Sequence, residues 1–166
     1  WQNGLQHGKG TLITPESQMY EGDWRERERH GTGKYYHSNG NMHEGEFREN
    51  KKHGNGTHYF ANGAMYKGQY ADNKIHGNGT NYFADGGMYQ GEWREGKQHG
   101  TGTLIFGQDG PSVKAGWEWV KPGDVYHGPL VNNKVHGIGQ WTHAKDSTTE
   151  RIQCSEGEHI DWPDRN

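Results

Sequence analysis

Short stretches of alternating apolar and polar residues run along most of the chain. In one of them, Tyr20, Gly22 and Trp24 alternate with charged residues, which is the two-residue period of a strand with one buried face. Residues 30–36 form a second such stretch, and the polar residues between the two predict a turn. Asn39-Gly40 predicts a further turn, because Asn-Gly favours positive φ. The pattern therefore predicts a β-hairpin.

The same hairpin pattern recurs along the chain. The tetrapeptide His-Gly-x-Gly recurs at four intervals of 23 residues and then at one of 37, beginning at His7, His30, His53, His76, His99 and His136. A second motif, Tyr or His followed by x-Gly-x and a large apolar residue, keeps the same phase. A fixed period of this length indicates a repeat protein. The predicted fold class is all-β: a single-layer elongated ribbon of about six tandem antiparallel β-hairpins.

Composition at first argues against a folded chain and then supports the repeat. Only 28% of the residues are hydrophobic and the mean hydropathy is −1.28, values that alone would suggest disorder. Yet 12% of the residues are aromatic, and the 28 glycines fall at regular intervals. Large rings bury the most area per residue, and the Gly-x-Gly segments of stacked hairpins leave space for them. We therefore expect rings packed over glycines to take the place of a central core.

The pattern divides the chain into a repeat array at residues 1–142 and a tail at residues 143–166. The array begins inside a repeat, because Trp1 precedes His7 at the spacing seen in the next repeat. The 37-residue interval holds an insertion of 14 residues, at about residues 107–125.

The acidic tail contains the single cysteine, Cys154. Cys154-Ser-Glu-Gly-Glu158 is similar to the second motif and predicts a degenerate capping strand, with Cys154 in the slot that Met holds elsewhere. We expect Cys154 to be a small buried residue rather than a reactive thiol. A lone cysteine excludes an intrachain disulfide, and no apolar run reaches the about 20 residues that span a bilayer. These features predict a cytoplasmic protein.

Histidines are numerous enough to raise the question of a metal site. Twelve are present, and six of them open the His-Gly-x-Gly motifs, which stacking would place ~10 Å apart. Because zinc–nitrogen bonds are about 2.0–2.1 Å, these histidines cannot share an ion, and we expect a repeated structural hydrogen bond. Nucleotide-loop and serine-nucleophile motifs are absent from the sequence. We predict no metal, no cofactor, no catalytic residue and no enzyme activity.

Tyr-x-Gly-x-Trp followed by His-Gly-x-Gly at 23-residue spacing resembles the MORN (membrane occupation and recognition nexus) repeat, over roughly residues 1–106 and 126–142. Some MORN proteins hold a helix or extended peptide along an aromatic groove, and others belong to cytoskeletal structures such as the radial spoke heads of cilia. The resemblance implies a non-enzymatic protein-binding scaffold in a cytoskeletal or ciliary assembly. It leaves open whether the partners include further MORN arrays or copies of this chain.

Aromatic columns at repeat spacing are the candidate partner-binding residues. One column comprises Tyr36, Tyr59 and Tyr82 and is continued by Ile105, and the other comprises Trp24, Phe47, Tyr70 and Trp93. The insertion adds Trp117 and Trp119, which either cover the end of the array or bind a partner, since Trp is favoured at interface centres.

Two alternatives to a protein-binding scaffold stay open. Binding of phosphoinositides or anionic membranes, which the family name implies, calls for clustered Lys and Arg. Residues 1–106 hold 12 basic and 12 acidic residues and the net charge of the chain is −3, which disfavours both membrane and nucleic-acid binding. The other alternative is a targeting array of a larger protein, since some MORN repeats precede a methyltransferase or lipid-kinase domain.

Overall fold

The computed structural model describes residues 7–108, 120–155 and 158–160. All regular structure among these residues is β-strand, which confirms the all-β prediction. The strands are β1 (Gly8–Ile13), β2 (Met19–Arg25), β3 (Glu28–Tyr36), β4 (Met42–Arg48), β5 (Lys51–Tyr59), β6 (Met65–Ala71), β7 (Lys74–Tyr82), β8 (Met88–Arg94), β9 (Lys97–Ile105), β10 (Val125–Val131), β11 (Lys134–Val135), β12 (Gly137–Thr142), β13 (Thr149–Ser155) and β14 (Glu158–Ile160).

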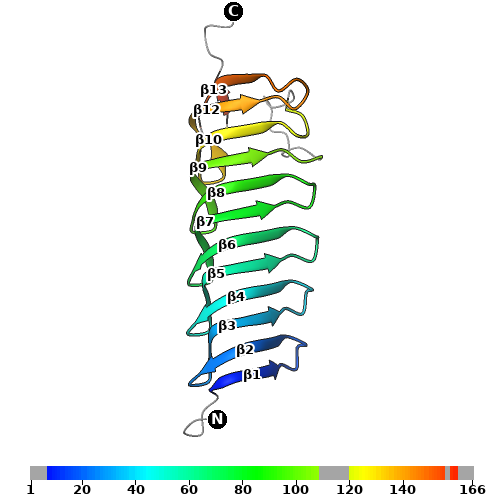
Figure 1. Cartoon of the computed structure of the whole chain (residues 1–166), viewed down its shortest axis with the longest axis vertical. Coiled ribbons are helices and arrows are strands. Elements are labelled where there is room, and N and C mark those ends of the chain that lie inside the picture. The colour runs from blue at the N-terminus through cyan, green and yellow to red at the C-terminus, as the bar shows by residue number, and fades with distance from the viewer. Residues whose placement is uncertain (1–6, 109–119, 156–157, 161–166) are drawn as a thin grey trace, which may run out of the picture. The chain divides into compact units, whose positions relative to one another are not determined.

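The chain divides into two compact units, Trp1–Gly77 and Asn78–Asn166, and the division falls within β7. In the first unit the strands pair in chain order, and the pairings from β1 to β6 are antiparallel. In the second unit the order is β8-β9-β10-β12-β13-β14, with the short β11 beside β10. Pairing in chain order is the arrangement of tandem hairpins, so that prediction is confirmed (Figure 1).

Tight and wide turns alternate along the chain, and Figure 1 shows them at opposite ends of the strands. The tight turn between β2 and β3 has two residues with positive φ, 52° at Glu26 and 69° at Arg27, the geometry of a type I′ turn. The wide turn before β4 has a φ of 85° at Gly40. The Gly40 N–H donates to the carbonyl of His37 at 3.1 Å. The predicted Asn39-Gly40 turn is therefore confirmed.

The long strands bend where a glycine pairs with a glycine on the neighbouring strand. In the first unit Gly22 pairs with Gly33, and the rings of Tyr20 and Trp24 approach to a centroid distance of 5.1 Å at right angles. Four residues of straight strand would span ~13 Å, so the backbone folds over between these two rings. A Cβ atom on Gly33 would lie 2.5 Å from the Oη of Tyr20. The glycines thus make room for the rings, as the sequence predicts.

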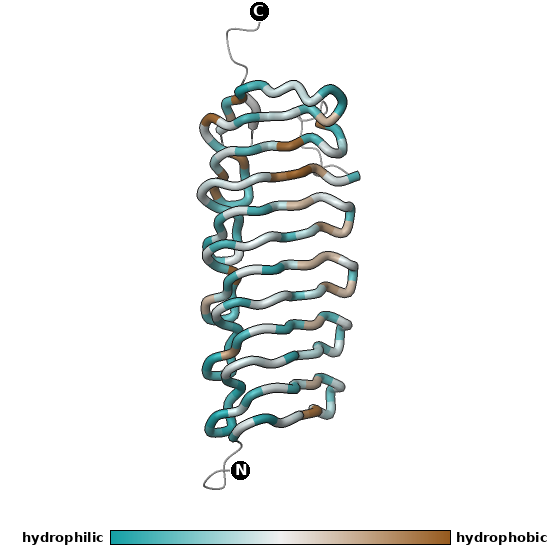
Figure 2. The backbone as a smooth tube through the Cα atoms, in the orientation of Figure 1, coloured by the Kyte–Doolittle hydropathy of each residue, from teal (hydrophilic) through white to brown (hydrophobic). Residues whose placement is uncertain are grey.

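The bend gives each unit an inner face, which carries the packed rings, and an outer face. In the first unit the inner-face residues that lie opposite one another across β2–β6 are Tyr20, Tyr35, His43, His58 and Tyr66. The matching outer-face column, which we name the Met/Tyr ladder, is Ile13, Met19, Tyr36, Met42, Tyr59 and Met65. Figure 2 shows that hydrophobic residues follow one another only in short stretches of the chain, as expected for strands with a single buried face.

The core of each unit is built mainly from inner-face rings. In the first unit the buried apolar residues are Tyr20, Trp24, Phe47, Tyr66 and Tyr70. In the second unit they include Tyr89, Trp93, Phe106, Tyr126, Leu130, Trp141, Ile152 and Cys154. Edge-to-face ring pairs of this kind stabilise by about 0.5–1.5 kcal/mol beyond their area burial.

The last strands correct one detail of the predicted cap. Cys154 pairs with Gly137, the first glycine of the last His-Gly-x-Gly motif. In the first repeat the equivalent glycine, Gly8, pairs with Trp24. Thr149, which pairs with Thr142, likewise corresponds to Met19, which pairs with Ile13. Cys154 therefore takes the Trp slot, and the prediction that it takes the Met slot is wrong by five residues.

The expectation of a buried thiol is confirmed. Cys154 is 2% exposed, and burial raises its pKa to about 11. At neutral pH the sulfur is therefore a protonated core group, because a thiolate is disfavoured in apolar surroundings.

Candidate functional site

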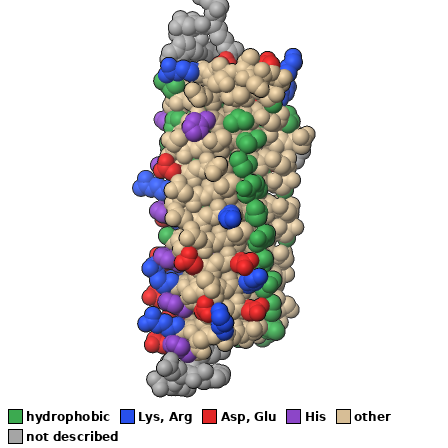
Figure 3. Space-filling view, in the orientation of Figure 1, with side chains coloured by type: hydrophobic (Ala, Val, Ile, Leu, Met, Phe, Trp, Pro, Cys, Tyr) green, Lys and Arg blue, Asp and Glu red, His purple; other side chains and the backbone are tan. Residues whose placement is uncertain are grey.

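The exposed members of the first aromatic column stand on the outer face. Tyr59 is 40% exposed and Tyr82 is 42% exposed, and Tyr36 is partly exposed. In the first unit Tyr36 and Tyr59 belong to the Met/Tyr ladder, where each lies between two methionines. Figure 3 shows hydrophobic side chains gathered in a stripe on a surface that is otherwise polar. A stripe of apolar side chains left open to solvent is typical of an interaction surface.

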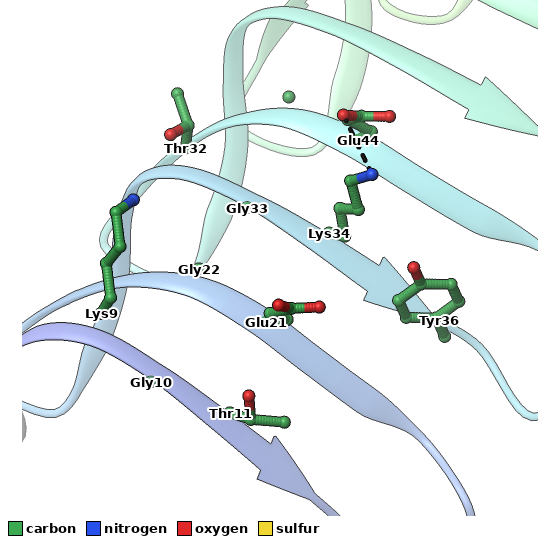
Figure 4. Close-up of a pocket in the computed structure, with 11 residues that line it drawn as sticks. Lys9, Gly10, Thr11, Glu21, Gly22, Thr32, Gly33, Lys34, Tyr36 and Glu44 are labelled. Carbon is green, nitrogen blue, oxygen red and sulfur yellow. Dashed lines mark ion pairs between the residues drawn. The ribbon is translucent and has the colours of Figure 1, made fainter.

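A shallow trough of about 670 Å³ lies beside the ladder in the first unit. Its floor is backbone at Gly10, Gly22, Gly33 and Gly45. Figure 4 shows Glu21, Lys34 and Tyr36 rising from the strands, with Lys9 and Thr32 at the end where the strands bend. Lys34 pairs with Glu44 at 3.4 Å. The trough is thus lined by glycine backbone, polar side chains and one ring, Tyr36, and its two lysines are matched by two glutamates.

The acidic residue of the second motif has a structural role that the sequence did not reveal. Its carboxylate accepts the backbone N–H of the residue between the two glycines of His-Gly-x-Gly: Thr32 to Asp23 at 2.9 Å, Asn55 to Glu46 at 2.8 Å and Thr101 to Glu92 at 3.1 Å. The hydrogen bond from Thr32, followed by that from Lys9, holds the pKa of Asp23 below its ordinary value. The recurrence of an acid directly after the motif glycine was the available signal.

The second aromatic column does not line an accessible groove, and that expectation is wrong. Trp24, Phe47, Tyr70 and Trp93 are between 3% and 8% exposed. The indole N–H of Trp24 donates to the carbonyl of Gly10 at 3.0 Å, and that of Trp93 donates to Gly79 at 3.1 Å. The bend at the glycine pairs takes these rings to the inner face, opposite the ladder, so the two columns cannot form one surface. The other candidates, Trp117 and Trp119, lie outside the described residues.

A cluster of basic side chains fills the inner face where β3, β4 and β5 meet. We name Arg29, His37, His43, Lys52 and His58 the inner basic cluster. The His58 ring centroid lies 5.8 Å from that of His37 and 5.9 Å from that of His43, and Lys52 Nζ lies 3.3 Å from His58 Nδ1. The Arg29 guanidinium lies over the Tyr35 ring at 4.8 Å. His43 occupies the position of Tyr20, Tyr66, Tyr89 and Tyr126 in other hairpins.

Burial dominates the electrostatics of this cluster. It lowers the pKa of His43 to about 3 and that of His58 to about 4, with the charge of Lys52 adding to both shifts. Burial, followed by the charge of Arg29, also holds the pKa of Lys52 below its ordinary value. His43 is 0% exposed, and its two ring nitrogens have no hydrogen-bond partner. The histidines are therefore neutral at pH 7, while Arg29 is charged.

The histidines of the His-Gly-x-Gly motifs do not show the expected repeated hydrogen bond. The Nδ1 atoms of His53 and His99 are buried without a partner. Among the described residues no group of three His, Cys, Asp or Glu side chains is arranged to hold a metal ion. A helix with the length and apolar character needed to cross a membrane does not occur in the described ranges.

Comparison with known proteins bears on the family of the chain. The family model described as MORN repeat matches residues 1–18, 20–42, 43–65, 66–88 and 89–109. No curated protein matches the chain by sequence. Among solved structures, the chain is similar to the SAS-4 (dCPAP) TCP domain of Drosophila melanogaster, which was solved in complex with a proline-rich motif of Ana2 (dSTIL). The TM-score is 0.49 and the sequence identity 13%, and the match covers 87% of this chain and 71% of that chain. The TCP10c domain of Drosophila melanogaster Sas-4 gives a TM-score of 0.47 and 15% identity, over 87% of this chain and 84% of that chain.

Proposed function

The chain belongs to the MORN repeat family, and we propose that it is a non-enzymatic scaffold that binds a helix or extended segment of a protein partner along its outer face. MORN repeats are generally modules for interaction with proteins or membranes. The observation that carries the proposal is the exposure of Tyr59, at 40%, in register with the partly buried Met42 and Met65 of the first unit. In the second unit Tyr82 is 42% exposed. Tyrosine supplies large contact area with few rotatable bonds, and methionine adapts to irregular surfaces.

The charges beside the ladder favour a protein over a membrane. Lys34 is paired with Glu44 at 3.4 Å and Lys9 with Asp23 at 2.9 Å, so a carboxylate stands beside each of these cations and offsets its charge. Attraction to an anionic membrane needs several unpaired Lys or Arg side chains, each contributing about 1 kcal/mol near the surface. A cytoskeletal or ciliary assembly, of the radial-spoke type, is the cellular setting that we propose from the family resemblance.

Proximity labelling combined with vesicle sedimentation tests this function. The wild-type chain, a Tyr59→Ser/Tyr82→Ser variant and a Lys67→Glu control are expressed in the same cells. We expect a set of proteins labelled by the wild type to be lost in the tyrosine variant and kept in the control. Sedimentation with anionic vesicles that is lost in Lys67→Glu and weakened by salt would instead support membrane binding and contradict the proposal.

A further inference from the structure

The inner basic cluster has cations but no acid to balance them. Neither Arg29 nor Lys52 forms an ion pair with any described carboxylate, and Arg29 instead donates to the backbone carbonyl of Asn50 at 2.7 Å. Both side chains are partly exposed. Burying part of a cation without a counter-ion costs free energy that a well-packed apolar side chain would not.

The carboxylates of the strands around the cluster are held elsewhere. Asp23 is bound by Lys9 and by the Thr32 backbone, and Glu44 pairs with Lys34. Glu46 accepts from the Asn55 backbone, and Glu28, the neighbour of Arg29 in β3, accepts from the Asn50 side chain at 3.4 Å. The titratable or charged groups that do face the cluster are Tyr20, Tyr35, Tyr66 and Tyr70, besides the members themselves. No described carboxylate is therefore paired with Arg29 or Lys52.

The hairpin fold does not require basic residues at the positions of the inner basic cluster. The position of Lys52 is taken by Gln98 in a later hairpin, and Gln98 is 9% exposed there. In other hairpins the position of His43 is taken by a tyrosine whose hydroxyl donates to a backbone carbonyl, at 2.9 Å in Tyr20 and Tyr89. His43 replaces that anchored group with two unpartnered ring nitrogens. An unbalanced site that the repeat could avoid indicates a ligand that supplies the missing charge.

We propose that the inner basic cluster of the first unit binds an acidic segment of a protein, with an Asp or Glu carboxylate held between Arg29 and Lys52. Guanidinium and ammonium groups form the strongest hydrogen bonds with carboxylates, and the partly exposed His37 stands close enough to His58 to extend the site. The site lies on the face opposite the Met/Tyr ladder, so it is a second binding surface that does not depend on the first.

Binding of a carboxylate should be linked to proton uptake. A negative charge beside His37 and His58 favours their protonated forms and raises their pKa values from the depressed values of the free protein. A group that binds protons more tightly in the complex makes the complex tighter as pH falls. Affinity for an acidic segment should therefore increase as pH falls from 7 toward 5, a range that lies above the pKa of about 4 of His58 in the free protein.

The test measures binding of a hexaglutamate peptide to the wild-type chain by fluorescence anisotropy. Lys52→Gln places at this position the residue that Gln98 already provides in a folded hairpin, so the variant is expected to keep its structure. We expect it to weaken binding about tenfold, the scale of one charge-assisted hydrogen bond. The matched control is Lys51→Gln, because Lys51 is exposed and pairs with Asp72 at 3.7 Å, and it should change the affinity less than about twofold.

Two further measurements separate the alternatives. Asn81 occupies the position of His58 in the next hairpin, so a His58→Asn variant should keep its melting temperature. We expect this variant to lose most of the pH dependence of peptide binding. Tyr59→Ser should leave peptide binding unchanged, which distinguishes this site from the ladder. Equal affinities of wild type and Lys52→Gln would overturn the proposal, as would tighter binding to phosphoinositide vesicles than to the peptide at equal salt.

Discussion

Gly33 shows how strongly a single residue constrains this fold. A Cβ added there would lie 2.5 Å from Tyr20 Oη and 2.6 Å from two ring carbons. Tyr20 cannot move aside easily, because it is 1% exposed and its hydroxyl donates to the carbonyl of Asp23 at 2.9 Å. The glycine is therefore required for packing rather than for a special φ.

We expect Gly33→Ala to lower the free energy of unfolding by about 1–3 kcal/mol, the usual cost of overpacking a core. Lys67→Ala, which trims an exposed side chain of β6, should change it by less than about 0.5 kcal/mol. Urea denaturation followed by tryptophan fluorescence measures both. Equal midpoints for the two variants would show that the ring does not need this space.

His43 makes the stability of the first unit depend on pH. Its pKa is about 3 in the folded chain and about 6.5 when unfolded, so the unfolded chain binds the proton more tightly. The stability that neutral His43 contributes is full above the unfolded pKa and is lost as pH falls toward the folded pKa.

Between pH 7 and pH 5 we expect the wild type to lose about 2 kcal/mol more than a His43→Tyr variant. Tyr is the residue found at this position in other hairpins, so the variant should fold. Urea titrations at the two pH values give the difference directly. A parallel decline in both proteins would mean that His43 is not buried in the neutral form.

At the scale of the hairpin, the tight turns are also connectors. Asn50 accepts the backbone N–H of Arg29 with its side-chain oxygen at 2.9 Å and donates its own N–H to the Arg29 carbonyl at 3.1 Å. Asn133 makes the same pair of bonds with Gln98, at 2.7 and 3.0 Å. One turn residue thus ties each of these hairpins to the preceding one.

Replacement of Asn50 by glycine isolates this contact. Gly tolerates the φ of 65° found at Asn50, and the change removes only the contacts of the side chain, so we expect a loss of about 1 kcal/mol. Asn132→Gly serves as the control, because Asn132 also has a positive φ, 52°, in a tight turn and its side chain is exposed. If Asn50→Gly leaves the chain as stable as the wild type, the turn is held by the backbone alone.

The hairpins were predictable from sequence because their signals are local. Alternation gave the strands, and Asn39-Gly40 gave a turn whose glycine has a φ of 85°. The type I′ turn at Glu26-Arg27 was not predictable in detail, since neither residue favours positive φ. The position of Cys154 in the repeat was predicted wrongly because it was inferred from the similarity of residues 154–158 to the second motif. The strand register, which decides that position, is set by the pairing with β12.

The candidate site was predictable only in part. Periodicity identified both aromatic columns, but it could not show that the strand bends at Gly22 and Gly33 and thereby buries Trp24 while Tyr36 stays outside. The inner basic cluster arises from residues far apart in the sequence, and each of them alone looked like an ordinary polar residue of a hairpin. Its composition becomes unusual only when the strands place the residues on one face.

At the scale of the molecule, what matters is whether aromatic rings or charges determine partner binding. Tyr59 is 40% exposed, so its ring can be changed with little effect on folding. For a protein partner found by proximity labelling, Tyr59→Ser should weaken binding by at least ~2 kcal/mol, the scale of an interface hot spot. Tyr59→Phe, which keeps the ring, should lose no more than about 1 kcal/mol.

Calorimetric titration of the purified partner into each variant measures these differences, after matching melting temperatures show that the variants are folded. Lys67→Glu, on the same face, should change the affinity little and the salt dependence only slightly, because the contact is apolar. If Tyr59→Ser keeps full affinity while Lys67→Glu abolishes it, the outer face binds through charge, and the ladder is not the binding surface. If both keep full affinity, the partner binds elsewhere on the chain.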